Sequence, residues 1–116
     1  MSELYQRWIP QMRKGLLELC VLTALTGGER YGYELVKSLL AIPGLGVSEG
    51  TLYPLLSRLR LQGLVETRLV ESEKGPARKY YRLTQAGRET AEAMDAHFET
   101  LIKAVRSLRR KSRRST

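Results

Sequence analysis

The 116-residue sequence predicts a mainly α-helical fold with a small β-hairpin. Three observations support this prediction: amphipathic segments come first, a stretch of alternating apolar residues follows, and a long apolar heptad stripe comes last. A chain of this length has room for one domain, and its apolar content of 42% is ordinary for a folded protein. The order of the elements is therefore the main guide to the fold.

The first two helices are predicted over residues 10–25 and 32–41. Apolar residues recur at spacings of three and four in the first, where Pro10 is acceptable in the first turn and Gly27-Gly28 ends the helix. In the second helix, Leu35 and Leu39 lie on the apolar face, and a Pro-Gly pair follows its end.

A third helix is predicted after Val47, with Ser48 as the N-cap and Gly63 just beyond its end. Leucines at positions 52, 55, 56 and 59 form one apolar face. Pro54 lies beyond the first turn, so we expect that turn to be kinked or tightened. The opposite face carries an aromatic, a hydroxyl and an arginine side chain, and it consists of Gly50, Tyr53, Pro54, Ser57, Arg58 and Leu61.

A hairpin is predicted next. Residues 64–70 alternate, with Val65, Thr67 and Leu69 on one face, and residues 79–83 are rich in β-forming side chains. The loop between the strands has a Gly-Pro pair and three cations that can meet phosphates, Lys74, Arg78 and Lys79. The same composition also fits a solvated surface turn.

The last helix is predicted over residues 85–110, with Thr84 as its N-cap. Its a/d heptad spacing is held for only about two and a half heptads, which is short for a free-standing coiled coil. An apolar stripe this long on so small a domain must be buried against another surface, and a second copy of the chain is the most economical partner. The stripe consists of Ala91, Met94, Phe98, Leu101, Val105 and Leu108.

The net charge of +8 belongs mainly to the end of the chain. Residues 106–116 carry six basic and no acidic side chains, whereas residues 1–105 hold 14 basic and 12 acidic ones. Such a tail either contacts nucleic acid or forms a solvated helix end that complements the helix dipole. Charge alone therefore does not identify a nucleic-acid-binding protein.

Three helices, a hairpin and a long helix occur in the order of a winged helix-turn-helix protein, in which the third helix enters the DNA major groove. We expect residues 1–83 to form this domain, residues 84–110 a dimerisation helix and residues 111–116 a basic tail. Near the start of the third helix, Ser48, Gly50 and Thr51 suit a phosphate. Further along, the exposed side chains of Tyr53, Ser57 and Arg58 can reach bases or backbone.

Four stretches resemble the PadR family of transcriptional regulators: MRKGLLELCVLTAL, YGYELVKSL, SEGTLYPLLSRLRLQGLVE and GPARKYYRLTQAGRE. They occur in the family's order and cover roughly Met12 to Glu89. The run GTLYPLLSRL followed by YYRLTQAG is the specific part, because generic winged helices share only the hydrophobic pattern. The short C-terminal region resembles the compact branch of the family, which has a single C-terminal helix.

The resemblance implies a homodimeric repressor on a palindromic operator of double-stranded DNA. The C-terminal helix would pack against the partner's N-terminal helix, with Leu16 and Cys20 in the interface. Tyr80 matches an aromatic at the base of the wing, where a hinge or core role competes with DNA contact. By position, the other DNA-facing residues would be Tyr31, Ser48, Gly50, Thr51, Tyr53 and Arg58, with Lys74, Arg78 and Lys79 in the wing.

Some compact members of the family bind flat aromatic compounds at the dimer interface, through a tryptophan in the C-terminal helix, and then release DNA. This chain has Phe98 in that region. Its only tryptophan, Trp8, is predicted to precede the first helix, from where it can approach the same interface. A small aromatic effector, if bound, would therefore involve Trp8 and Phe98.

Other function classes have little support. The single cysteine excludes a disulfide framework, which fits a reducing cytoplasm, and Cys20 is interpreted as a small buried hydrophobe rather than a redox group. His97 has no partner at ligand spacing, so we expect no metal and no cofactor. No Ser/His/carboxylate set or phosphate-binding glycine loop indicates an enzyme. No targeting or membrane-spanning segment is seen, which predicts a soluble, cytoplasmic protein.

Two alternatives to a sequence-specific repressor remain open at this point. In one, the winged helix binds another protein, which would require an acidic or apolar recognition face; Tyr53, Ser57 and Arg58 argue against this. Packing against the first helix would explain Tyr31 and Tyr33 equally well, whatever the function. In the other, the basic tail binds chromosomal DNA without sequence preference.

Overall fold

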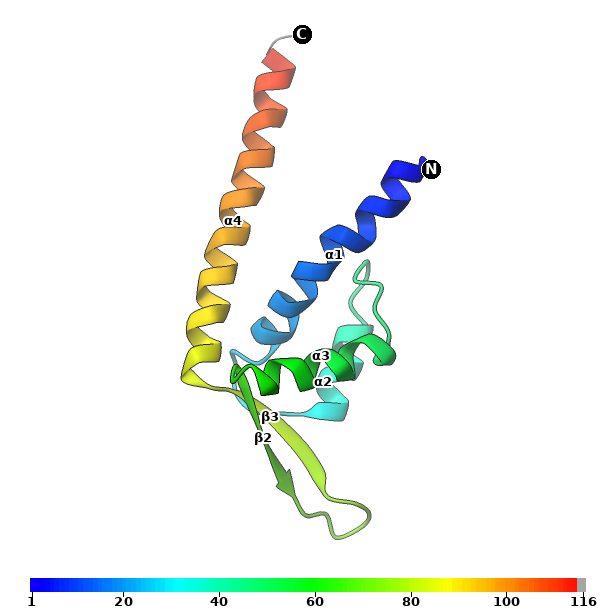
Figure 1. The fold of residues 1–116 in the computed structure, drawn as a ribbon, viewed down its shortest axis with the longest axis vertical. Coiled ribbons are helices and arrows are strands. Elements are labelled where there is room, and N and C mark those ends of the chain that lie inside the picture. Colours follow the sequence, from blue (N-terminus) through cyan, green and yellow to red (C-terminus); the bar gives the residue numbers. More distant parts are fainter. Residues whose placement is uncertain (115–116) are drawn as a thin grey trace.

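The computed structural model describes residues 1–114 and contains every predicted element, with one additional strand. In Figure 1, α1 and α4 project from one end of the body and the hairpin projects from the other. The helices are α1 (Glu3–Ala24), α2 (Gly32–Leu40), α3 (Glu49–Leu61) and α4 (Gln85–Arg114), and the strands are β1 (Arg30–Tyr31), β2 (Val65–Val70) and β3 (Arg78–Leu83).

The strands form one antiparallel sheet in the order β1-β3-β2, rather than the two-stranded hairpin that was predicted. Strand β1 pairs Tyr31 with Tyr80, and β2 pairs with β3 along its whole length. A two-residue strand has too few side chains to show alternation, which is why the sequence does not reveal β1. Leu69 shares a face with Val65, but the hairpin has left the body at that point and the side chain is 67% exposed.

Helix α1 starts seven residues earlier than predicted, so Pro10 lies in its interior. Ser2 is the N-cap, and its hydroxyl accepts a hydrogen bond from the Tyr5 N–H at 3.1 Å. Proline removes one helical hydrogen bond, but this part of α1 is exposed and water can satisfy the freed carbonyl. The earlier start also corrects the expected place of Trp8, which lies within α1 and not before it.

Helix α4 extends to Arg114, so residues 111–114 of the predicted tail continue the helix. Residues 115–116 lie outside the described part of the chain. Within residues 1–114, no helix combines the length and the apolar character needed to span a membrane.

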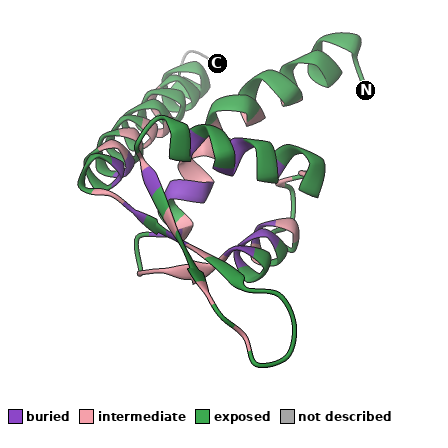
Figure 2. Cartoon of the chain, turned by 60° about the horizontal axis from the view of Figure 1, so that its bottom comes forward, coloured by how far each residue is buried: buried purple, intermediate pink, exposed green. Residues whose placement is uncertain are grey.

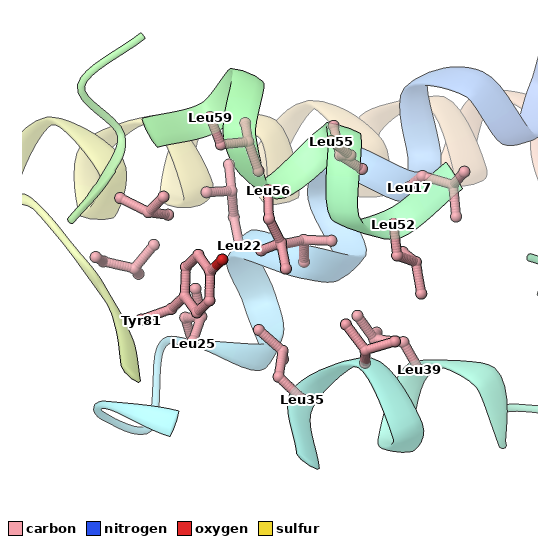
Figure 3. Close-up of a cluster of buried hydrophobic side chains, with 14 of the residues drawn as sticks. Leu17, Leu22, Leu25, Leu35, Leu39, Leu52, Leu55, Leu56, Leu59 and Tyr81 are labelled. Atoms are coloured by element: carbon pink, nitrogen blue, oxygen red, sulfur yellow. The ribbon is translucent and has the colours of Figure 1, made fainter. Parts of the chain in front are cut away.

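One leucine-rich core joins α1, α2, α3 and the hairpin (Figure 3). Leu22, Leu35 and Leu56 are completely buried, and Tyr81 and Leu83 bring β3 into the same cluster. Burying a leucine side chain contributes about 2 kcal/mol, so this cluster is the main source of stability. Figure 2 shows that burial is confined to the body, whereas the outer parts of α1 and α4 are largely exposed.

Helix α3 has the predicted boundaries and a tightened first turn. Ser48 is the N-cap, and its carbonyl accepts hydrogen bonds from the N–H groups of both Thr51, at 3.1 Å, and Leu52, at 3.0 Å. Its hydroxyl lies 3.3 Å from the Thr51 hydroxyl and caps no backbone group. The helix continues through Pro54, and Gly63 follows its end with a φ of 77° that other residues rarely adopt.

A junction of hydrogen bonds ties the end of α3 to the start of α4. The Thr84 hydroxyl donates to the Gly63 carbonyl at 2.6 Å and accepts from the Gly87 N–H at 3.0 Å, as expected for the N-cap of α4. The Thr84 N–H donates to the Leu64 carbonyl at 3.1 Å. A side chain at position 87 would overlap that same carbonyl group, so only glycine fits there.

We expect Gly87→Ala to destabilise the fold by about 3 kcal/mol, because the new methyl group must push Leu64 and the start of the hairpin away from α4. Chemical denaturation measures the change. Gly27→Ala is the matched control, since a Cβ at that position meets nothing within 4 Å and its φ is not positive. Equal stability of the two variants would mean that the junction is not tightly packed.

Candidate nucleic-acid interface

The side of α3 that faces away from the core is exposed along its whole length. Leu52, Leu55 and Leu59 anchor the helix to the core from the other side. Among the described residues, the side chains of Ser57 and Arg58 have no hydrogen bond or ion pair, so both are available to a ligand. All of the α3 residues predicted to face DNA are exposed, namely Ser48, Gly50, Thr51, Tyr53, Ser57 and Arg58.

A side chain of α1 binds the loop that precedes α3. The Arg13 guanidinium donates to the Gly46 carbonyl at 3.1 Å, in the loop just before Ser48. This contact joins residues that are 33 positions apart, and no local pattern in the sequence could reveal it. It fixes the loop from which the exposed first turn of α3 begins.

A cluster of three tyrosines lies between α2 and the base of the hairpin. The ring of Tyr31 is 5.6 Å from that of Tyr80 and 6.0 Å from that of Tyr33, measured between centroids. Tyr33 is 50% exposed, so it is not buried against α1. We call Tyr31, Tyr33 and Tyr80 the tyrosine cluster.

Each tyrosine of the cluster carries a cation over its ring. The Arg78 guanidinium is 5.0 Å from the centroid of Tyr31, and the Lys37 ammonium is 5.2 Å from that of Tyr33. The Arg68 guanidinium is 5.7 Å from the centroid of Tyr80. Stacking on the rings therefore holds three cationic side chains at the base of the wing.

Arg68 is also held by a forked ion pair with Glu29, at 2.7 Å and 2.6 Å between nitrogen and oxygen atoms. The hydrogen bond from Arg68 lowers the pKa of the Glu29 carboxyl from its ordinary value. The pair is therefore kept as the pH falls, until the lowered pKa is reached. Sequence reasoning missed both residues, because they are 39 positions apart and neither belongs to a recognisable pattern.

Helix α3 lies next to the tyrosine cluster. The pKa of Tyr53 is raised, first by partial burial, then by the Glu49 carboxylate, and further by the nearby Tyr31 and Tyr33. Tyr31 and Tyr33 therefore lie near Tyr53, and α2 contacts both α3 and β3, so α3 and the base of the hairpin lie on two sides of the tyrosine cluster.

The loop of the hairpin projects away from the body, as Figure 1 shows. Lys74 and Lys79 are exposed, and Arg78 is exposed while stacked on Tyr31. A second ion pair, Arg82 to Glu66 at 2.6 Å, joins directly paired positions of β2 and β3 and supports the register of the strands.

A groove of about 1150 Å³ lies between α1 and α4, on the projecting side of the molecule. Its walls are mainly apolar, and Trp8 of α1 and Phe98 of α4 both line it. The other predicted interface residues that line it are Leu16, Met94, Leu101, Val105 and Leu108.

Two residues predicted for the dimer interface pack against the core of their own chain. Ala91 is only 4% exposed and belongs to the core, since α4 lies on the body at this level. Cys20 is partly buried against the same core, and burial raises the pKa of its thiol. Periodicity alone could not separate these residues from the stripe, because apolar spacing is the same whether a helix faces its own core or a partner.

No group of three or more His, Cys, Asp or Glu side chains among residues 1–114 lies close enough together to hold a metal ion.

Comparison with known proteins gives a consistent result. The sequence model of the transcriptional regulator PadR-like family matches residues 21–93. A transcriptional regulator of Mycobacterium tuberculosis is 39% identical over 97 residues, which is 82% of this chain and 87% of that protein.

Solved structures agree with this likeness. A PadR-like transcriptional regulator from Bacillus cereus is 41% identical, with a TM-score of 0.74 over 84% of this chain and 95% of that one. A PadR family regulator from Eggerthella lenta is 34% identical, with a TM-score of 0.76 over 91% of this chain and 92% of that one.

We expect Arg58→Ala to weaken binding to a DNA site selected from a random pool by about 1–3 kcal/mol, and to relax preference at one base pair, because a bidentate base contact is lost. Titrations with single-base variants of the site measure both effects. Arg60→Ala is the matched control, being an exposed arginine about 200° further around the same helix. Uniform weakening across all sequences would instead assign Arg58 to a phosphate.

Proposed function

Because the chain belongs to the PadR-like family of transcriptional regulators, we propose that it is a homodimeric repressor that binds a palindromic operator. The observation that carries this proposal is the division of the molecule into two surfaces. The polar and cationic surface of α3 and the wing is at one end, and the apolar groove between α1 and α4 is at the other. One surface suits DNA and the other suits a second copy of the chain.

On the DNA side, α3 enters the major groove, which is about 12 Å wide and accepts one helix. Tyr53, Ser57 and Arg58 then face base edges and nearby phosphates. At the start of the helix, the N–H groups of Glu49 and Gly50 have no helical acceptor and point toward a phosphate. Lys74 and Lys79 in the wing neutralise phosphates that flank the groove.

The tyrosine cluster orients the wing before DNA binds. Stacking of Arg78 on Tyr31 and of Arg68 on Tyr80, together with the Glu29–Arg68 pair, fixes the hairpin relative to α2 and α3. Ordering these long side chains in advance lowers the entropy that is lost on binding. In this proposal Tyr31 and Tyr80 act mainly by positioning cations.

On the other side, the groove is too apolar to remain open to water. Leu101 is 53% exposed and Leu108 is 66% exposed in the single chain. The radius of gyration is 17.5 Å, whereas a compact chain of this length has about 13 Å. A second chain that packs on α1 and α4 buries the exposed leucines and makes the assembly more compact than the single chain. The two-fold symmetry of such a dimer gives an operator with two related half-sites.

A flat aromatic effector is a second candidate occupant of this groove, because Trp8 and Phe98 form parts of its opposite walls. Binding there would alter how the two chains pack and so release DNA. Titration of the DNA-free protein with flat polycyclic aromatic compounds should quench the fluorescence of Trp8, and Phe98→Ala should weaken the effect. A compound that quenches Trp8 without lowering DNA affinity is not an inducer.

We expect Leu101→Asp to weaken the dimer more than about a hundredfold, because it buries an unpaired carboxylate between the two chains. Sedimentation measures the oligomeric state, and circular dichroism shows whether the helices remain. Affinity for DNA from the promoter of the chain's own gene should fall together with the stability of the dimer. The control Ala96→Asp adds the same charge to the exposed opposite side of α4. A Leu101→Asp dimer as stable as the control would contradict the proposed interface.

A further inference from the structure

The charges of α4 are sorted along its length. Residues 89–99 carry four acidic and no basic side chains, and residues 103–114 carry seven basic and no acidic ones. The helix dipole favours this order only in the first and last turns. Asp95 and Glu99, and likewise Arg106, lie well inside the helix, so the dipole does not account for them.

These interior charges have no ion-pair partners among the described residues. Both salt bridges found among residues 1–114 lie in and beside the sheet, from Arg68 to Glu29 and from Arg82 to Glu66. Asp95, Glu99 and Arg109 are exposed. Within the described residues, Asp95 and Glu99 in the acidic half and Arg106 and Arg109 in the basic half therefore have no ion-pair partner in the isolated chain.

One strip of residues connects this charge pattern to the apolar stripe. Asp95, Ile102 and Arg109 are spaced by seven, so they lie one above another along one flank of the stripe. Ile102 and Arg109 also line the groove. The strip is acidic at one end, apolar in the middle and basic at the other.

This strip is complementary to itself when two helices run in opposite directions. If Leu101 packs against Val105 of a second copy, Phe98 meets Leu108, Ile102 meets Ile102 and Asp95 meets Arg109. The overlap then begins just beyond Ala91, the last residue of α4 that is buried in its own core. In a parallel pair the same residues would come level, and like charges would repel along both halves.

We propose that two copies of α4 pair in antiparallel orientation, with the acidic half of each beside the basic half of the other. This inference rests on the proposed homodimer and names how its helices meet. The Asp95–Arg109 contact occurs twice in the dimer and fixes both the direction and the register. The basic end of α4 is then used by the partner chain, and dimerisation weakens as salt screens these pairs.

The test is a charge exchange. Asp95→Arg and Arg109→Asp, each alone, place two like-charge contacts in the dimer and should raise its dissociation constant about tenfold at low salt. The double variant restores both contacts with reversed sign and should return to near the wild-type value. The matched control is Arg110→Asp, which makes the same change one residue away, on the side opposite the stripe.

Mixing the two single variants gives a second readout. In the heterodimer, the arginine introduced at position 95 of one chain meets the aspartate introduced at position 109 of the other. The second contact joins the unaltered Arg109 of the first chain to the unaltered Asp95 of the second. Both contacts are then attractive, so native mass spectrometry should find the heterodimer in excess of either homodimer.

The outcomes separate the two proposals. A wild-type chain that is monomeric by sedimentation would contradict the homodimer itself. A stable wild-type dimer with no rescue and no heterodimer preference would overturn only the antiparallel pairing. Single variants that lose DNA affinity while dimerising normally would also overturn the antiparallel pairing.

Discussion

The junction at Thr84 and Gly87 is the constraint on which the rest of the structure depends. Thr84 binds the carbonyl that ends α3 and caps the helix that begins α4, while the missing side chain of Gly87 lets the two backbones touch. Helix α3, the hairpin and α4 therefore meet at one hydrogen-bonded junction. In a dimer held through α4, this junction sets the distance and angle between the two recognition helices.

Stability and assembly are supplied by different parts of the chain. The fully buried part of the leucine core reaches along α1 and α4 as far as Leu17 and Ala91, and Met94 packs against its edge. The outer turns carry the apolar stripe and the sorted charges, whose favourable interactions need a partner. In the proposed homodimer, the stability of the outer helices depends on protein concentration. The surface of α3 and the wing, by contrast, is organised within a single chain by the tyrosine cluster.

Sequence reasoning succeeded where one local pattern determines the structure. The leucine face of α3, its N-cap Ser48 and the cap of α4 at Thr84 all follow from spacing and residue type, and the resemblance drawn from GTLYPLLSRL agrees with the family match. It failed where long-range contacts decide. The Glu29–Arg68 pair and strand β1 are formed by partners distant in the chain. Pro10 was read as a helix start, although an exposed helix tolerates an internal proline.

The most direct test of the central claim is a hydroxyl-radical footprint of the full chain on DNA from the promoter of its own gene, at fixed salt near physiological strength. We expect two protected half-sites related by a two-fold axis, with centres about one helical turn or a multiple of it apart, because one dimer presents two copies of α3 to one face of the duplex. Each half-site should extend into the flanking region that the wing covers. A single asymmetric site, or even protection of all sequences, would contradict a dimeric, sequence-specific repressor.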